Sequence, residues 1–178
     1  VSGHTKGALT AVKQIAEMKV DVPMLAMTHC DAAKLSKQHG KKSEYALCAS
    51  QWHKTLSYTD AFFKDGMTYD ADFKKAFGYA PPYQAAESSA ALLVFKDAFE
   101  RANDFDTKKV RNALAKTDMQ TFYGNIKFAK GGQNVSKPMV LFQVICNSDG
   151  SKCENKVVAP TKWASAKLVH PTPSWSKR

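Results

Sequence analysis

Apolar residues along the first fifty positions follow helical and strand-like patterns in turn. From Thr5 to Met18 they fall on one helical stripe, which predicts an amphipathic helix. Val22 to Met27 is almost entirely apolar, as is typical of a parallel strand buried on both faces. A short helix from Asp31 to Gln38 and a strand from Glu44 to Ala49 follow. This alternation predicts an α/β fold with a parallel sheet flanked by helices.

After Ala49 the pattern changes, and aromatic residues become frequent. Tyr69, Phe73 and Phe77 recur at intervals of four, which predicts a helix that Gly78 ends. The longest predicted helix comes next and is apolar on more than one stripe. A helix of this kind needs a substantial partner to bury it.

The last third of the chain reads as a helix, strands and a tail. Asp106 is placed to cap a short helix. The alternating segment from Thr121 to Phe128 predicts a single strand, and Pro138 to Cys146 with Cys153 to Val158 predicts a hairpin. The tail, with its two tryptophans among Pro and Ser, is expected to lie along a surface.

Polar residues follow the predicted strand ends, where ligands bind in open α/β sheets. Thr28 and His29 come directly after an apolar strand, and Asp31 opens a helix there. His4 ends a segment that looks like the end of a strand already under way, so we expect that the chain was cut from something longer. The residues at or just after predicted strand ends are His4, Thr28, His29, Cys30, Cys48 and His53, and we expect some of them to line a ligand site.

Two aromatic residues are further candidates for ligand contact. Trp52 follows a strand end and Tyr83 begins the longest predicted helix. For both, packing in a core or at a hinge competes with stacking on a ligand.

The four cysteines form two suggestive pairs. Cys146 and Cys153 flank an Asp-Gly turn, and Cys30 and Cys48 each lie at the end of a predicted strand. Two disulfides would indicate an oxidising compartment. Four free buried thiols in a reducing compartment are the alternative.

Charge and length exclude several classes of protein. The formal net charge is +10, but the lysines are dispersed and not interleaved with aromatic residues, which argues against nucleic-acid binding. Solvated lysine-rich faces explain the charge more simply. No apolar run is long enough to cross a membrane.

Catalysis and metal binding have weaker support in the sequence. Cys30 at a helix N-terminus, with His29 or His4 as base, would make a small α/β thiol enzyme or redox protein, and this is the alternative function. No phosphate loop, nucleophile elbow or pair of catalytic carboxylates accompanies it. His29 and Cys30 are adjacent, which is not the spacing of known metal sites, so we expect neither a metal nor a cofactor.

Five segments carry a resemblance to a known family. The segment YAPPYQAAESSAALLVFKDAFERA from Tyr79 to Ala102 resembles the signature helix of periplasmic solute-binding proteins of ABC importers, in the branched-chain amino-acid (Leu/Ile/Val) group. The later segments that are similar to this family are Lys109–Ala115, Thr121–Phe128, Gly132–Asn134 and Lys137–Val144.

The resemblance implies the C-terminal half of a type I fold with two α/β lobes. Residues 1–52 would belong to the second lobe, and 53–136 would contain a crossing near Gln51 to Leu56 and then pack on the first lobe. Residues 137–178 would form the final crossing, a hairpin and the tail. The helix from Tyr83 to Ala102 would then pack on a sheet from the missing N-terminal half.

The resemblance also implies a function without chemistry. A small amino acid or related carboxylate or amide would bind in the interlobe cleft, and a membrane permease would receive the closed form. The protein would lie in the periplasm or outside the cell after removal of its signal peptide. The family's aromatic contact falls at His4 or Thr5 and its acidic contact near Thr28 or His29. Because neither position is acidic here, a simple leucine-type ligand is not expected.

Overall fold

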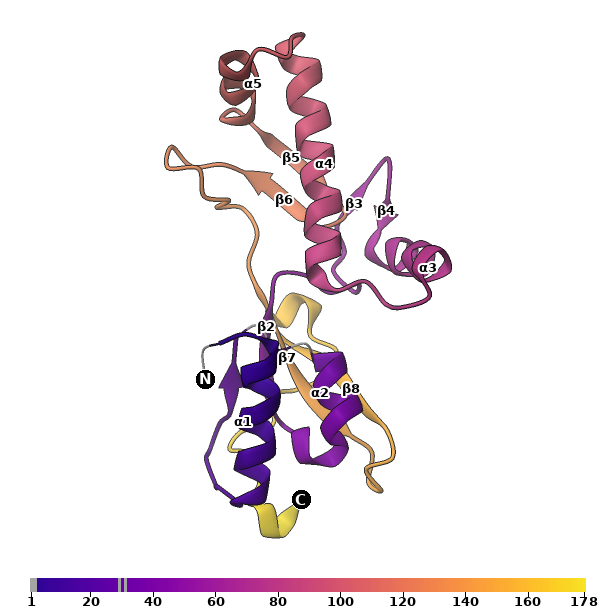
Figure 1. The fold of residues 1–178 in the computed structure, drawn as a ribbon, viewed down its shortest axis with the longest axis vertical. Coiled ribbons are helices and arrows are strands. Elements are labelled where there is room, and N and C mark those ends of the chain that lie inside the picture. Colours follow the sequence, from indigo (N-terminus) through magenta and orange to yellow (C-terminus); the bar gives the residue numbers. More distant parts are fainter. Residues whose placement is uncertain (1–2, 29, 31) are drawn as a thin grey trace. The chain divides into compact units, whose positions relative to one another are not determined.

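The structure is a computed structural model that describes residues 3–28, 30 and 32–178. The chain divides into two compact units (Figure 1). Unit 1 consists of Val1–Ser50 and Met139–Arg178, and unit 2 of Gln51–Pro138. The assignment of residues 1–52, 53–136 and 137–178 to lobes and crossings stays a prediction.

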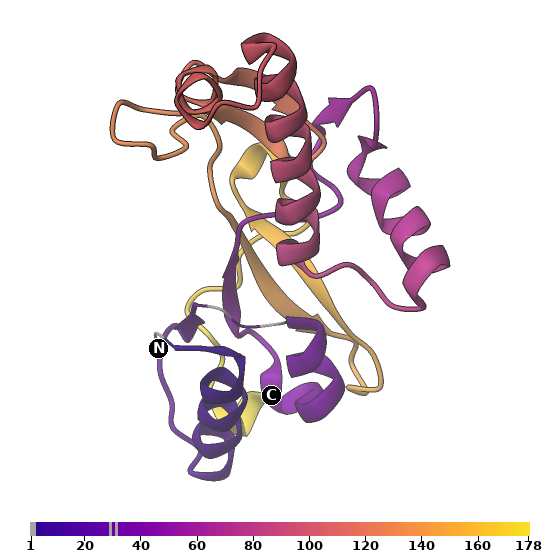
Figure 2. The ribbon, with the colours of Figure 1, turned by 45° about the horizontal axis from the view of Figure 1, so that its top comes forward.

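Unit 1 is built on a four-stranded mixed sheet with the order β1-β2-β7-β8. β1 and β2 are parallel, whereas β7 is antiparallel to both β2 and β8. Figure 2 shows β7 and β8 as a long hairpin, coloured orange to yellow. The elements of unit 1 are α1 (Thr5–Glu17), β1 (Ala26–Met27), α2 (Ala32–His39), η1 (Gly40–Ser43), β2 (Leu47–Ser50), β7 (Val140–Cys146), β8 (Cys153–Ala159), η2 (Thr161–Trp163) and η3 (Trp175–Lys177). The helix–strand alternation and the hairpin predicted from the sequence are confirmed.

Two different coverings protect the faces of this sheet. α1 and α2 lie over one face, where Val12 and Leu35 join Cys48 and Val144 in a buried apolar cluster. On the other face, the fully buried Gln143 side chain forms hydrogen bonds with the C-terminal tail. Its amide oxygen accepts a hydrogen bond from the Val169 N–H, and its amide nitrogen donates to the Val169 carbonyl. The buried amide is thus satisfied by the tail, as a buried polar group must be.

The first strand differs from its prediction. β1 contains only two residues, and among the described strands it forms an edge of the sheet. Met27 is buried, but Ala26 is exposed and 44% of Met24 is accessible. The expectation of a strand from Val22 to Met27 buried on both faces is therefore wrong for this chain, because β1 has a strand neighbour on one side only.

Unit 2 combines three helices with two small antiparallel sheets. Its elements are β3 (Thr59–Asp60), β4 (Lys64–Asp65), α3 (Gly66–Phe77), α4 (Tyr83–Ala102), α5 (Thr107–Leu114), β5 (Asp118–Thr121) and β6 (Gly124–Lys127). Local capping sets the helix ends as predicted: Gly78 takes the left-handed conformation (φ 77°) after α3, and the Asp106 carboxylate accepts a hydrogen bond from the Lys109 N–H at the start of α5.

The segment from Thr121 to Phe128 is a turn and a second strand, not the single strand that its alternation predicts. β5 and β6 pair as a hairpin that reverses at Phe122 and Tyr123. Gly124 opens β6 with φ 147°, a conformation that favours glycine. Both aromatic residues are buried, so the turn itself supplies the apolar positions that suggested a strand.

α4 buries one stripe and exposes another. Ala86, Ala90, Val94 and Ala98 recur every four residues and are buried. Leu92 is 69% accessible, and the rings of Phe95 and Phe99 stack on the exposed side with centroids 6.1 Å apart. The prediction of a helix with more than one apolar stripe is confirmed. Among the described helices, α4 included, none combines the length and apolar character needed to cross a membrane.

Candidate ligand-binding site

The start of α1 and the end of β1 lie together in unit 1. The Gly3 N–H donates a hydrogen bond of 3.3 Å to the hydroxyl of Thr28. His4 is the N-cap of α1 and is exposed, while Thr5 begins the helix and is half-buried. The structure thus brings three of the predicted site residues, His4, Thr5 and Thr28, to one edge of the sheet.

The electrostatic character of this edge favours an anion. α1 has no acidic residue in its first turn, and the His4 side chain makes no cap hydrogen bond. The N-terminus of a helix carries a partial positive charge, and its backbone N–H groups can bind a carboxylate. The fourth predicted residue, His29, lies outside the described residues, as does the predicted cap Asp31.

A disulfide fixes the end of β1 next to β2. Cys30 and Cys48 are bonded, and their Cα atoms are 5.7 Å apart. Cys48 also pairs with Met27 in the parallel register. The bond therefore fastens the segment that follows Thr28 to the neighbouring strand. In this disulfide Cys30 is not the free thiol that the alternative of a thiol enzyme requires.

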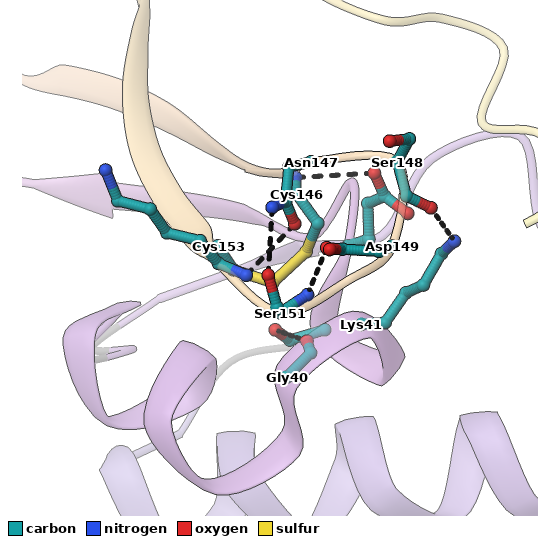
Figure 3. The surroundings of a disulfide bond; sticks show 11 residues. Gly40, Lys41, Cys146, Asn147, Ser148, Asp149, Ser151 and Cys153 are labelled. Atoms are coloured by element: carbon teal, nitrogen blue, oxygen red, sulfur yellow. Dashed lines mark hydrogen bonds between the residues drawn. A yellow bond between two sulfur atoms is a disulfide. The ribbon is translucent and has the colours of Figure 1, made fainter.

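The second disulfide closes the hairpin between β7 and β8. Cys146 is bonded to Cys153, and Figure 3 shows the short loop that separates them. Within the loop the Asn147 amide oxygen accepts a hydrogen bond from the Lys152 N–H, and the Lys41 ammonium donates one to the Ser148 carbonyl. Both predicted disulfide pairs are therefore present in the structure, and all four cysteines belong to unit 1.

Trp52 is a core residue of unit 2. Only 5% of it is accessible. Its ring makes edge-to-face contacts with Tyr69 and Phe122 at centroid distances of 5.8 and 6.0 Å. Aromatic pairs of this geometry stabilise a core beyond the area that they bury. Of the two roles considered for Trp52, packing in a core and stacking on a ligand, these contacts agree with packing.

Tyr83 is the first residue of α4 and is half-buried. It acts electrostatically on Tyr123, whose pKa is raised mainly by burial and further by Glu87 and Tyr83. A contact between Tyr83 and a ligand stays a prediction, as it does for the other proposed site residues.

Sequence reasoning missed a groove in unit 2. It has a volume of about 500 Å³, which is within the range of small-molecule sites. The apolar residues that line it include Ala90, Val94, Phe95, Leu114, Ile126 and Phe128. From α4 it takes Ala90 and Val94 of the buried stripe together with Phe95, and the apolar pattern of this helix in the sequence predicts a packing face.

Polar side chains also line this groove, among them those of Glu87, Tyr123 and Lys137. The Lys137 ammonium lies 4.2 Å from the centre of the Tyr123 ring. Burial lowers the pKa of Lys137 to about 8, and the charge of Glu87 acts in the opposite direction. Within the described residues, no group of His, Cys, Asp and Glu side chains is arranged to hold a metal ion.

Comparison with known families identifies the class of this protein. The family described as periplasmic binding proteins matches residues 1–151. This chain therefore belongs to the periplasmic binding protein family.

Solved structures share the fold at low sequence identity. A leucine-binding protein from Thermotoga maritima has a TM-score of 0.71 at 21% identity over 90% of this chain. A leucine-, isoleucine-, valine-, threonine- and alanine-binding protein from Brucella ovis, in its closed conformation, has a TM-score of 0.71 at 15% identity over 97%. A branched-chain amino-acid transporter substrate-binding protein from Streptococcus pneumoniae, in complex with isoleucine, has a TM-score of 0.65 at 16% identity over 88%.

The matched region covers less than half of each of these solved chains. It spans 44% of the Thermotoga protein, 45% of the Brucella protein and 43% of the Streptococcus protein. The fold of this chain thus corresponds to the type I periplasmic-binding fold in part.

Proposed function

We propose that this chain is the C-terminal portion of the solute-binding component of an ABC importer. Its ligand is a small amino acid or a related carboxylate or amide, bound between two lobes without chemistry. Closure of the lobes presents the loaded form to a membrane permease, because a ligand stabilises the conformation to which it binds better. Family membership and the partial match to amino-acid-binding proteins support this proposal.

One hydrogen bond in the structure supports a carboxylate or amide as the ligand. The hydrogen bond between Gly3 and Thr28 joins the positive end of α1 to the carboxyl end of β1. A carboxylate or amide oxygen suits the backbone N–H groups of such a helix end. Since the described part of this edge contains no carboxylate from His4 to Thr10 or at Thr28, the ammonium of an amino acid would need an acid from another segment.

The proposed location is the periplasm or the outside of the cell. Two disulfides in unit 1 agree with an oxidising compartment. The proposed partners are the permease and the N-terminal half that the longer relatives have. The exposed stripe of α4 is the surface on which a sheet from that half would pack.

A thermal-shift screen tests the proposal. The ligands are amino acids, their amides and the corresponding carboxylates, added to this chain and to the polypeptide of the full reading frame. A ligand at 100 times its Kd stabilises the folded state by about 2.7 kcal/mol. We expect carboxylates to raise the melting temperature of the longer polypeptide, and a screen without any shift there would contradict the proposal.

A pair of threonine variants locates the site. Thr28→Val removes the hydroxyl at the sheet edge at nearly constant volume, and we expect the ligand-induced shift to fall or disappear. Thr10→Val is the matched control, because the Thr10 hydroxyl is exposed and donates a hydrogen bond to the Lys6 carbonyl of its own helix. Equal shifts for both variants would place the ligand elsewhere.

A further inference from the structure

The chain enters and leaves unit 2 at two neighbouring points. Gln51 is the first residue of the unit, and Lys137 is the last residue before Pro138 at its end. The Lys137 ammonium donates a hydrogen bond to the main-chain carbonyl of Gln51. One side chain thus ties the outgoing segment to the incoming segment, although 86 positions separate them in the sequence.

The turn between β5 and β6 holds Lys137 in place. The Lys137 ammonium lies over the ring of Tyr123, 4.2 Å from its centre, where a cation is attracted to the ring face. The Lys137 stem lies against Gly124, and a Cβ atom on Gly124 would be 2.3 Å from Cδ of Lys137. Gly124 therefore keeps open the channel that this side chain occupies.

The same turn also holds the incoming segment. Phe122, which precedes Tyr123, is fully buried and contacts the ring of Trp52, the residue after Gln51. The Phe122 N–H donates a hydrogen bond of 2.7 Å to the Asp60 carboxylate, which fixes the turn against β3. Phe122 and Tyr123 thus contact the incoming and the outgoing segment, respectively.

We propose that the Phe122–Gly124 turn, acting through Lys137, is a staple that keeps the two connecting segments of unit 2 together and positions them as a pair. The inference rests on the proposed function. In a solute-binding protein that opens and closes, paired connecting segments restrict the motion to one bending mode. Lys137 is then a positioning residue that adjusts the population of the binding-competent form without touching the ligand.

The charge of Lys137 gives the staple a measurable signature. Burial brings the pKa of this ammonium to about 8, and the charge of Glu87 on α4 acts in the opposite direction. The phenol of Tyr123, whose own pKa is raised by burial, faces the ammonium as a neutral ring. Loss of the proton above this pH weakens the hydrogen bond to Gln51, since charged donors bind more strongly than neutral ones.

Carbonyl-detected NMR of the 178-residue chain tests the tie directly. The ¹³C shift of the Gln51 carbonyl should titrate with a midpoint of about 8 in the wild type. It should not titrate in Lys137→Met, and Lys137→Arg should hold the bonded shift across the range because its guanidinium stays charged. A wild-type Gln51 shift that does not change with pH, or one that titrates equally in Lys137→Met, would overturn the proposal.

Amide hydrogen exchange measures the consequence for the segments. Near pH 7, exchange of the amides near Gln51 and Lys137 should be faster by about tenfold in Lys137→Met, the loss expected for one charge-assisted hydrogen bond. Gly124→Ala should act in the same way, because it displaces the Lys137 stem. Lys130→Met is the control and should leave these rates unchanged, because Lys130 is exposed and lies, like Lys137, in the segment between β6 and β7. Unchanged rates in both Lys137→Met and Gly124→Ala would refute the staple.

Ligand affinity of the full-reading-frame polypeptide separates this inference from the proposed function. A ligand that binds the wild type and Lys130→Met, but binds Lys137→Met several-fold differently, supports the staple. Equal affinity in the wild type and both variants would show that the tie is structural only and would overturn its role in binding. The NMR and exchange measurements need no ligand, so they remain decisive even when no ligand is found.

Discussion

The two units reach stability by different means. Unit 1 surrounds one sheet with helices and a tail, and both disulfides of the chain cross-link it. Unit 2 has no cysteine, and an aromatic core holds it together while one face of α4 stays exposed. Unit 1 thus buries an apolar cluster beneath its two helices, whereas unit 2 leaves an apolar stripe of α4 exposed.

The largest effect should come from the aromatic core of unit 2. Phe122 stacks on Tyr69 with centroids 4.3 Å apart and also contacts Phe63 and Trp52. Phe122→Ala should lower the free energy of unfolding of unit 2 by about 3–5 kcal/mol, measured by urea denaturation followed by hydrogen exchange. Phe105→Ala, at a position that is 84% accessible, should change it by less than about 0.5 kcal/mol. Similar losses for both variants would show that the core lies elsewhere.

Removal of a disulfide should be nearly as costly, but in unit 1 only. Cys30 and Cys48 are separated by 18 positions, and closing a loop of this length in the unfolded chain stabilises a protein by about 3 kcal/mol. The double variant Cys30→Ala/Cys48→Ala should lose about this amount in unit 1 and leave exchange in unit 2 unchanged. Thiol counting on the unfolded wild type should find no free thiol, and any reactive cysteine would contradict the pairing.

A smaller effect should appear as a pH dependence in unit 2. The pKa of Lys137 is about 8 in the folded state and 10.5 without the protein environment. Between these values the unfolded chain binds more protons, so the free energy of unfolding rises with pH. After allowance for partial exposure, we expect the wild type to gain about 1–2 kcal/mol relative to Lys137→Met between about pH 7.5 and 10. A constant difference would show that Lys137 is solvated in both states.

The smallest change in stability should come from the exposed stripe of α4. Leu92→Ser with Phe95→Ser should alter the free energy of unfolding by less than about 0.5 kcal/mol, because surface substitutions seldom do more. It should nevertheless reduce dye binding and self-association of this chain, since a contiguous apolar patch attracts partners. Met18→Ser removes an exposed apolar residue from unit 1 and should have no such effect. Dye binding that stays unchanged in the α4 variant would remove the argument for a partner on that face.

The sequence by itself determined the features that depend on near neighbours. The bounds of α4, the glycine end of α3 and the Asp106 cap of α5 agree with their predictions. Each depends on side chains within four positions and on backbone groups of the same helix. The resemblance to periplasmic binding proteins could also be found from the sequence, because its main segment contains one continuous helix.

The cysteine pairs and the sheet edge were predicted in part. Strand ends in a parallel sheet meet at one edge, which brought Cys30 to Cys48 and Thr28 to the start of α1. The edge position of β1 was not predicted, because the apolar run from Val22 to Met27 does not show how many strands pair beside it.

Only the tertiary structure decided the rest. Phe122 and Tyr123 lie in a segment that alternates like a strand, yet they form a turn. Gly124 permits the reversal, and long-range contacts bury both rings. The hydrogen bond from Lys137 to Gln51 spans 86 positions and leaves no periodic trace in the sequence. Local patterns specify helices and caps because their partners are close along the chain. The groove and the staple depend on segments that meet only after folding.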